Sequence, residues 1–405
     1  MPKLGKRANA LKQFNKQRKD SAQMTITSVT RFVFSTFVFG LEFTNAAGFM
    51  LLNDVKPPSQ SAFYKAEHEV VDVLLEMANE DVNKNLEALK EGAIITLDGS
   101  WRTKRNSRTF ILDAIDVITK KIIAFVLIDK DDKNNPYDGS SNMMEAAAFR
   151  KMIPKLMASG KISAIVKDGD TKLAGIAKEF GWDVTFLQDP QHLKKNFGTL
   201  FTKYNKIAGG KLKGYKQKII NHINYVLYSE KTPDEKREMF LNIIQHFTGN
   251  HANCNHNDES IKHVKELKGD KQVAAFVDLV KETATLFGDF DPKLTTNYNE
   301  NFHSVKARYL SKNLNIGYSW KGRIAAAILQ YNDKYNWIGR ACQRLHLPSI
   351  SLPCLHAFIK LINHSLQRMA HNKAKRNTKE AKHNRREKQI AAIKLEQTNN
   401  PEAHK

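Results

Sequence analysis

The sequence predicts an α/β fold with a mixed five-stranded sheet, preceded by a helical segment and followed by a helical insertion. Five short apolar segments between residues 93 and 187 have the length of strands. Polar turns join the first three, and segments with helical spacing separate the last three. Strands joined by short turns form an antiparallel meander, whereas strands joined through a helix add in parallel.

The elements of this sheet follow in the order strand, strand, strand, helix, strand, helix, strand, which is the order of the RNase H-like fold. The predicted strands are 93–97, 108–118, 122–128, 162–166 and 183–187. The predicted helices are 141–159, with Ser141 as the expected N-cap, and 172–180, which ends before Gly181.

The segments outside the sheet predict further parts of the chain. Residues 25–52 are strongly apolar and end near the Pro57-Pro58 step, and residues 61–90 show helical spacing. The predicted parts are a basic disordered arm (1–20), a small helical domain (21–90), the five-stranded core (91–190), a mainly helical insertion (191–294), a C-terminal helical part of the core (295–345), and a C-terminal helix with a basic tail (346–405).

The charge of the chain predicts a polyanionic partner. The formal net charge is +22 and the pI about 9.7, so we expect a nucleic acid as the partner. Residues 1–20 hold seven basic and one acidic residue, and residues 368–405 hold eleven and four. The basic clusters at 373–376 and 385–388 predict import into the nucleus, and solvated tails that bind nothing are the alternative.

Cysteine content and hydropathy predict a reducing compartment and no membrane segment. Three cysteines cannot build a disulfide framework. The most apolar run, 26–52, is interrupted by Arg31 and Glu42, whereas a membrane span needs roughly 20 nearly charge-free residues.

Three acidic residues stand where this fold can bring them together. Asp98 ends the first strand, Asp168 follows the fourth, and Glu300 lies in the first turn of a helix after the insertion. Phosphodiester cleavage can use two metal ions held by carboxylates, and Mg²⁺ or Mn²⁺ prefers such hard oxygen ligands. We expect Asp98, on the central strand, to bridge the two ions.

Other acids near these positions leave alternatives open. Asp170 competes with Asp168 for one role and otherwise caps the following helix, and Glu145 is a candidate fourth carboxylate. Asp113 and Asp116 lie on the second strand and could face the site, but they are interpreted as structural. An Asp at the end of a strand is most often a turn former, so each acid alone is a weak signal.

Five motifs in order give the chain a family resemblance. They are DGSW at 98–101, GSSNMME at 139–145, VKDGD at 166–170, DPQH at 189–192 and TTNYNENFHS at 295–304. On these motifs the chain resembles eukaryotic cut-and-paste transposases of the Mutator-like group, with hAT and Kolobok-type elements as neighbours, over about residues 90–340.

The resemblance implies a DDE-type DNA transposase that cleaves transposon ends and transfers them into target DNA. It implies Asp98, Asp168 and Glu300 as the catalytic acids, double-stranded DNA as the partner and a homo-oligomer as the working form. The alternatives are a domesticated DNA-binding protein without catalysis and an RNase H-like nuclease without strand transfer. The complete set of acids argues against the first, and the insertion of about a hundred residues before Glu300 argues against the second.

The pair Asp189 and His192 has two interpretations. Three positions apart, the two residues share a helix face if a helix starts there. A helix N-cap with a packed histidine is one interpretation. The family resemblance implies the other, a place near the active site where His192 orients a phosphate or donates a proton.

The start of the insertion is rich in lysine and aromatic residues. Residues 192–222 hold eight lysines and no acid, namely Lys194, Lys195, Lys203, Lys206, Lys211, Lys213, Lys216 and Lys218. We expect the lysines to contact DNA phosphates and the interleaved Phe197, Phe201, Tyr204 and Tyr215 to stack on unpaired bases. A solvated helix face above core aromatics is the alternative.

A histidine-rich segment later in the insertion favours a structural zinc site. His251, Cys254 and His256 give the pattern H-x-x-C-x-H, and His246 lies close by. Zn²⁺ takes nitrogen and sulfur ligands in this way. The second C-x-x-C half of a zinc module is missing, so an Asn-rich polar loop remains the alternative.

Overall fold

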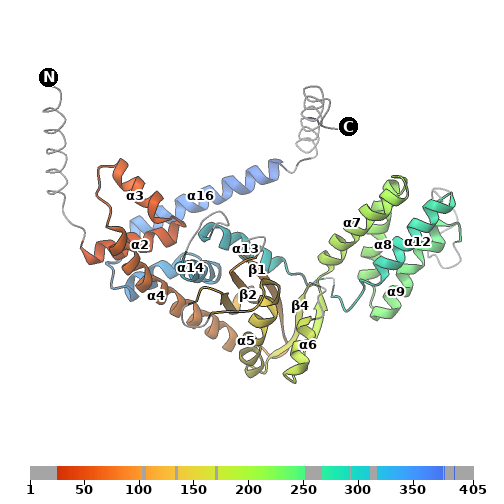
Figure 1. The fold of residues 1–405 in the computed structure, drawn as a ribbon, viewed down its shortest axis with the longest axis horizontal. Helices are drawn as coiled ribbons and strands as arrows, with labels where there is room; N and C mark the ends of the chain where they lie inside the picture. The colour runs from red at the N-terminus through yellow and green to blue at the C-terminus, as the bar shows by residue number, and fades with distance from the viewer. Residues whose placement is uncertain are drawn as a thin grey trace. The chain divides into compact units, whose positions relative to one another are not determined.

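The computed structural model describes residues 25–102, 106–132, 136–168, 172–250, 267–291, 293–310 and 317–376, together with residues 378 and 387. One compact unit ends at Trp337, and a second begins at Ile338. The sheet and its helices belong to the first unit (Figure 1).

The sheet confirms the predicted RNase H-like fold. Its strands are β1 (Ala93–Trp101), β2 (Thr109–Asp116), β3 (Ile122–Asp129), β4 (Ile162–Lys167) and β5 (Thr185–Gln188). They lie side by side in the order β3-β2-β1-β4-β5. The first three pair antiparallel, and β4 and β5 add in parallel, each through a helical crossover. The connections are α5 (Met144–Ala158) and α6 (Lys172–Glu179).

Side chains alternate between the two faces of β1, so that one face belongs to the hydrophobic core and the other carries Asp98. Ile95 and Leu97 are buried in the hydrophobic cluster that includes α5 and α6. Asp98 and Ser100 alternate with them and therefore point to the opposite face. That face contacts α13 (Asn297–Tyr309), which packs against β1 and β2.

Two predicted boundaries were wrong for reasons that lie outside the local sequence. β1 continues four residues past the predicted end, because Gly99, Ser100 and Trp101 pair with β2. Ser141 is not an N-cap: a 3-10 helix, η1 (Ser141–Met143), precedes α5, and the Ser141 hydroxyl donates to the backbone oxygen of Ser107 at 2.8 Å.

Two of the N-terminal helices pack on α14 (Trp320–Asp333). The N-terminal helices are α2 (Ile26–Phe39), α3 (Phe43–Leu52) and α4 (Gln60–Glu87), and α2 and α4 make these contacts. α4 contacts α14, α2 and β3. The α2 helix ends at Gly40 with φ 66°, so close to α13 that a Cβ there would lie 2.2 Å from the backbone oxygen of Arg308. The first helices therefore help to position α13.

Among the described residues, no single helix is both long enough and apolar enough to cross a membrane. Only α2 and α3 taken together pass such a test by length and composition, and they are bent by 114°. Val33 and Phe37 of α2 are buried in the protein core.

The insertion forms a helical bundle with its own core. Its described elements are α7 (Pro190–Ile207), η2 (Lys213–Tyr215), α8 (Lys216–Leu227), α9 (Pro233–Leu241), α10 (Ile243–Phe247) and α12 (Asp270–Ala284). Phe197, Phe240 and Phe276 are among the residues buried in its hydrophobic cluster. At its base, the N–H of Gln188 donates to the backbone oxygen of Asp289 at 2.7 Å.

The chain then returns to the sheet with α13 and α14 and continues in α15 (Asn336–Arg344) and α16 (Leu352–Arg376). α13 packs against α14 as well as the strands. The predicted domain boundaries remain predictions.

Candidate active site

Asp98 lies within β1, and Asp168 directly follows the neighbouring parallel strand β4. β1 and β4 pair with Thr96 opposite Val166. Each aspartate stands two residues after one member of this pair, so continuation of the same register beyond β4 would set the two next to each other on one face. The negative charge of Asp168 raises the pKa of Asp98, in agreement with this arrangement.

The Asp98 carboxyl group is held in an environment that disfavours its charge. Burial is the largest cause and raises its pKa to about 6. The imidazole of His303 and the N–H of Gly99 lower the pKa, whereas the carboxylates of Asp113 and Asp168 raise it. A cation placed here would relieve the crowding of negative charge.

Asp113, interpreted from the sequence as structural, lies directly opposite Asp98 on β2. Its side chain is 0% exposed. Asn299 donates to its Oδ2 at 2.7 Å, and Nε2 of His303 lies 3.2 Å from its Oδ1. The other ring nitrogen of His303, Nδ1, lies 3.6 Å from Oδ2 of Asp98. His303 therefore connects the buried and the accessible carboxylate.

Glu300 lies in the first turn of α13, and its side chain is exposed. On a helix it stands about 60° from His303, on the side away from Asn299. It therefore lies on the surface next to the residues that face β1 and β2. An acid in the first turn is also favoured by the helix dipole, which explains the residue without catalysis.

The three proposed acids are not grouped closely enough in this structure to hold a metal ion together. Within the ranges that the structure describes, no three His, Cys, Asp or Glu side chains are grouped so that they could hold a metal ion. Asp170, the competitor of Asp168, lies outside the described residues. The donor set itself fits Mg²⁺ or Mn²⁺, because Asp98 and Asp168 offer hard carboxylate oxygens in an excess of negative charge.

Glu145 has a different partner from the one expected of a fourth metal ligand. Its Oε1 lies 3.3 Å from Nζ of Lys167, whose side chain is only 4% exposed. The same Nζ lies 3.5 Å from Oδ1 of Asp168. Lys167 thus supplies a positive charge between the two carboxylates, and Glu145 serves to balance it.

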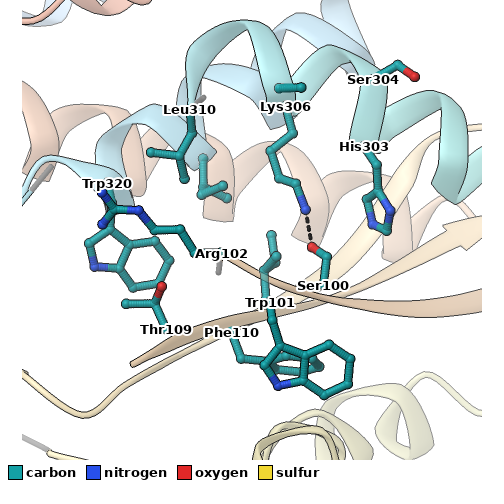
Figure 2. A pocket seen from close by; sticks show the side chains of 13 residues that line it. Ser100, Trp101, Arg102, Thr109, Phe110, His303, Ser304, Lys306, Leu310 and Trp320 are labelled. Carbon is teal, nitrogen blue, oxygen red and sulfur yellow. Dashed lines mark hydrogen bonds between the residues drawn. The ribbon is translucent and has the colours of Figure 1, made fainter. Parts of the chain in front are cut away.

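The DGSW motif has a physical explanation beyond its aspartate. The ring of Phe110 covers Gly99 so closely that a Cβ there would lie 2.3 Å from it. Lys306 of α13 donates a hydrogen bond to the Ser100 hydroxyl (Figure 2). The Trp101 ring packs 4.8 Å from that of Phe110, and its N–H donates to the backbone oxygen of Ser141.

The DPQH motif begins the insertion with a cap. Asp189 is the N-cap of α7, accepting from the N–H of Gln191 at 2.7 Å. Its other oxygen accepts from the N–H and the hydroxyl of Thr296, at 2.9 and 2.5 Å. Asp189 therefore connects the start of the insertion to the start of α13. The N-cap interpretation is confirmed for Asp189, and His192 is half-buried in the first turn of α7.

The lysines at the start of the insertion lie on the surface, whereas most of the interleaved aromatic residues are buried. Seven of the eight lysines are exposed, and Lys194 is half-buried. Phe197, Phe201 and Tyr215 are buried in the core of the bundle, and Tyr204 donates to Glu282 at 2.6 Å. The expectation that these aromatic residues stack on bases was therefore wrong. Helical spacing in an amphipathic segment had indicated the core instead.

The predicted zinc segment lies largely beyond what the structure describes. His251, Cys254 and His256 fall outside the described residues. His246 is half-buried in the last turn of α10. The zinc site stays a prediction.

Sequence analysis missed Asp113, Asn299 and His303 as members of this site. The available signal was the spacing of Asn299 and His303, which stand four apart on one face of the helix that carries Glu300. For Asp113 the available signal was its place on the second strand, from which it could face the site, but it was interpreted as structural.

Comparisons with known proteins gave a family match and a similar solved structure. A family model described as Mutator-like transposase matches residues 6–261, more than half of the chain. The matched span contains Asp98, Asp168, Asp189 and His192 and ends before Glu300. Among solved structures, a chain of the Drosophila P element transposase strand transfer complex is similar, with 12% identity and a TM-score of 0.32, over 80% of this chain and 99% of that chain. A comparison with curated proteins gave no match.

Proposed function

The chain belongs to the Mutator-like transposase family, and from this premise we propose that it is a metal-dependent cut-and-paste enzyme of the DDE type. It cleaves DNA strands at transposon ends and transfers the freed ends into target DNA. The catalytic acids are Asp98, Asp168 and Glu300.

One observation carries the proposal. Asp98 lies on the central strand of an RNase H-like sheet and Asp168 directly follows the neighbouring strand β4, and burial and like charges raise the pKa of Asp98 to about 6. A carboxylate with a perturbed pKa is typical of a functional site. A purely structural aspartate pair would gain nothing from this repulsion.

Each residue of the proposed site has its own role, either in metal binding or in orienting a metal ligand. Asp98, Asp168 and Glu300 are the residues that would hold the metal ions, with Asp98 on the central strand. Two Mg²⁺ or Mn²⁺ ions, when bound, supply the charge that activates an attacking water or 3′-hydroxyl and stabilises the leaving oxygen. His303 orients the Asp98 carboxylate through its contact with buried Asp113.

The proposal also covers the DNA partner, the cellular location and the oligomeric state. The exposed lysines of α7 and α8, together with those of the loop between them, contact the phosphates of double-stranded DNA without reading its sequence. The enzyme acts in the nucleus, as a homo-oligomer that joins the two transposon ends.

The test is cleavage and strand transfer in vitro with the terminal inverted repeats that flank the gene, in Mg²⁺ or Mn²⁺. The wild type is expected to nick the repeat end and join it to plasmid DNA. Asp98→Ala, Asp168→Ala and Glu300→Ala are each expected to lower the rate by at least about 10³-fold, because each removes a ligand of the metal pair.

Asp183→Ala is the matched control, since Asp183 is an exposed acid in the loop before β5. It is expected to leave both steps unchanged. DNA binding without any cleavage by the wild type would refute catalysis and indicate a DNA-binding protein. Cleavage without joining would leave a nuclease. Undiminished activity of one alanine variant would remove that residue from the mechanism.

A further inference from the structure

A pocket of about 310 Å³ opens beside the carboxylate pair, between β1, β2, α13 and α14 (Figure 2). His303 lines the pocket and also lies 3.6 Å from Asp98. Ser100, another lining residue, follows Asp98 by two positions on the same face of β1, a distance of about 7 Å. The pocket is therefore adjacent to the acidic site, and His303 contacts both.

The lining combines an apolar wall with a cationic rim. Ile111, Leu310 and Trp320 are buried side chains of the wall. Arg102 and Lys306 bring positive charge, and Lys306 donates to Ser100. Figure 2 shows Lys306 and His303 pointing from α13 toward β1, with Trp320 and Arg102 at the end opposite His303.

The helix presents one face to this space. Lys306, Ala307 and Leu310 stand three, four and seven positions after His303, which places all four on one side of α13. The same helix carries Glu300. A ligand in the pocket would thus contact the helix that supplies the third proposed acid.

We propose that this pocket receives one unstacked base of the DNA strand that is cleaved at Asp98 and Asp168. The inference rests on the proposed function. A nucleobase has apolar faces and polar edges, and its phosphates are anionic, which matches an apolar wall with a cationic rim. Pockets that bind small ligands start near 300 Å³.

The position favours a base within the strand over a free nucleotide. Stacked DNA advances 3.4 Å per nucleotide on each strand, so about 7 Å corresponds to one or two nucleotides from the scissile phosphate. A base that leaves the stack here remains covalently attached to the strand at the acidic site. Enzymes that act on DNA use such extrusion when the stack blocks access.

The first experiment places 2-aminopurine, which fluoresces more strongly when unstacked, at each of the two nucleotides on either side of the cleavage point. The duplex carries the terminal inverted repeat, and Asp98→Asn protein is used so that the DNA stays uncut. Fluorescence is expected to rise about twofold or more at one position. No rise at any position, while anisotropy shows binding, would overturn the proposal.

The second experiment fills the pocket. Ala307→Phe is expected to abolish the fluorescence rise and to slow cleavage about 10- to 100-fold, because the strand is misplaced. Ala307→Ser keeps the pocket open and is the matched control. Cleavage by Ala307→Phe is expected to recover when the identified nucleotide is abasic. Ala307→Leu, a smaller filling, replaces it if the larger variant does not fold.

The outcomes separate this inference from the proposed function. If the wild type does not cleave, both are overturned. If the wild type cleaves but Ala307→Phe behaves like Ala307→Ser, only the pocket assignment is overturned. Deoxynucleoside monophosphates that inhibit cleavage competitively without changing the fluorescence pattern of bound DNA would indicate a free nucleotide and would also overturn it.

Discussion

Nε2 of His303 lies 3.2 Å from Oδ1 of Asp113, a carboxylate that is 0% exposed. Asn299, one turn earlier on α13, donates to the other oxygen of the same carboxylate. The buried aspartate therefore holds two side chains of α13 against β2. Since Nδ1 of His303 faces Asp98, the orientation of an accessible carboxylate depends on a buried one.

Loss of the His303 imidazole should weaken metal binding more than the chemical step. In His303→Ala, Asp98 is no longer oriented, and the metal concentration for half-maximal cleavage should rise about 10- to 100-fold. The measurement is the rate of cleavage as a function of Mn²⁺ concentration, at saturating DNA. His303→Asn retains a donor and should recover part of the affinity. A normal metal requirement in His303→Ala would show that the imidazole has only a packing role.

The raised pKa of Asp98 predicts that removal of its charge stabilises the metal-free protein. Its folded pKa of about 6 exceeds the ordinary value of 3.8, so the folded state binds more protons between these pH values and loses stability as pH rises through this window. Asp98→Asn should therefore unfold with a free energy about 1 kcal/mol higher at pH 7, a value reduced for screening because the side chain is 36% exposed.

Denaturation in chelator at several pH values measures this gain. The difference between Asp98→Asn and wild type should shrink as pH falls from 6 toward 4 and vanish below it, where Asp98 is protonated in both states. Asp183→Asn, at an exposed loop acid, serves as the control. A gain that persists at low pH would come from packing or hydrogen bonding and not from the charge.

Gly99→Ala should disturb the DGSW segment by overpacking. A Cβ at this position would lie 2.3 Å from the Phe110 ring, so we expect a loss of about 1–3 kcal/mol in the free energy of unfolding. Phe110→Leu should reduce this loss, so that the double variant is more stable than the sum of the single changes predicts. Gly175→Ala, in an exposed and open position of α6, should instead be neutral or stabilising. Additive effects of Gly99→Ala and Phe110→Leu would contradict the contact.

The sheet could be predicted from the sequence because its signals are local. Short apolar segments, polar turns and helical spacing gave all five strands and their order. The extension of β1 through Gly99 and Ser100 could not be predicted in this way. Lys306, the partner of Ser100, lies 206 positions away, and polar residues after an apolar segment are typical of a turn.

The site could be predicted only in part, for a similar reason. Asp98 and Asp168 were predicted because each follows an apolar segment of strand length, although in the structure Asp98 lies within β1 and only Asp168 follows its strand. The contact of Asp113 with His303 spans 190 positions and depends on the pairing register of β1 and β2. At Ser141 a local signal was misleading. The residue has the N-cap preference of serine, but its hydroxyl donates to the backbone oxygen of Ser107, 34 positions away, and does not cap the helix.

The bond between Asp189 and Thr296 should stabilise the junction of the insertion with the core. Asp189→Ala removes the N-cap of α7 and leaves the buried N–H and hydroxyl of Thr296 without their acceptor, so a loss of about 3 kcal/mol is expected. Thr296→Val removes only the hydroxyl and should cost about 1–2 kcal/mol, whereas Thr296→Ser keeps it and should cost little. Because both changes break the same bond, the double variant should lose less than their sum when denaturation midpoints are compared. Strictly additive losses would mean that Asp189 stabilises α7 alone, and that the start of α13, one turn before Glu300, is positioned by other contacts.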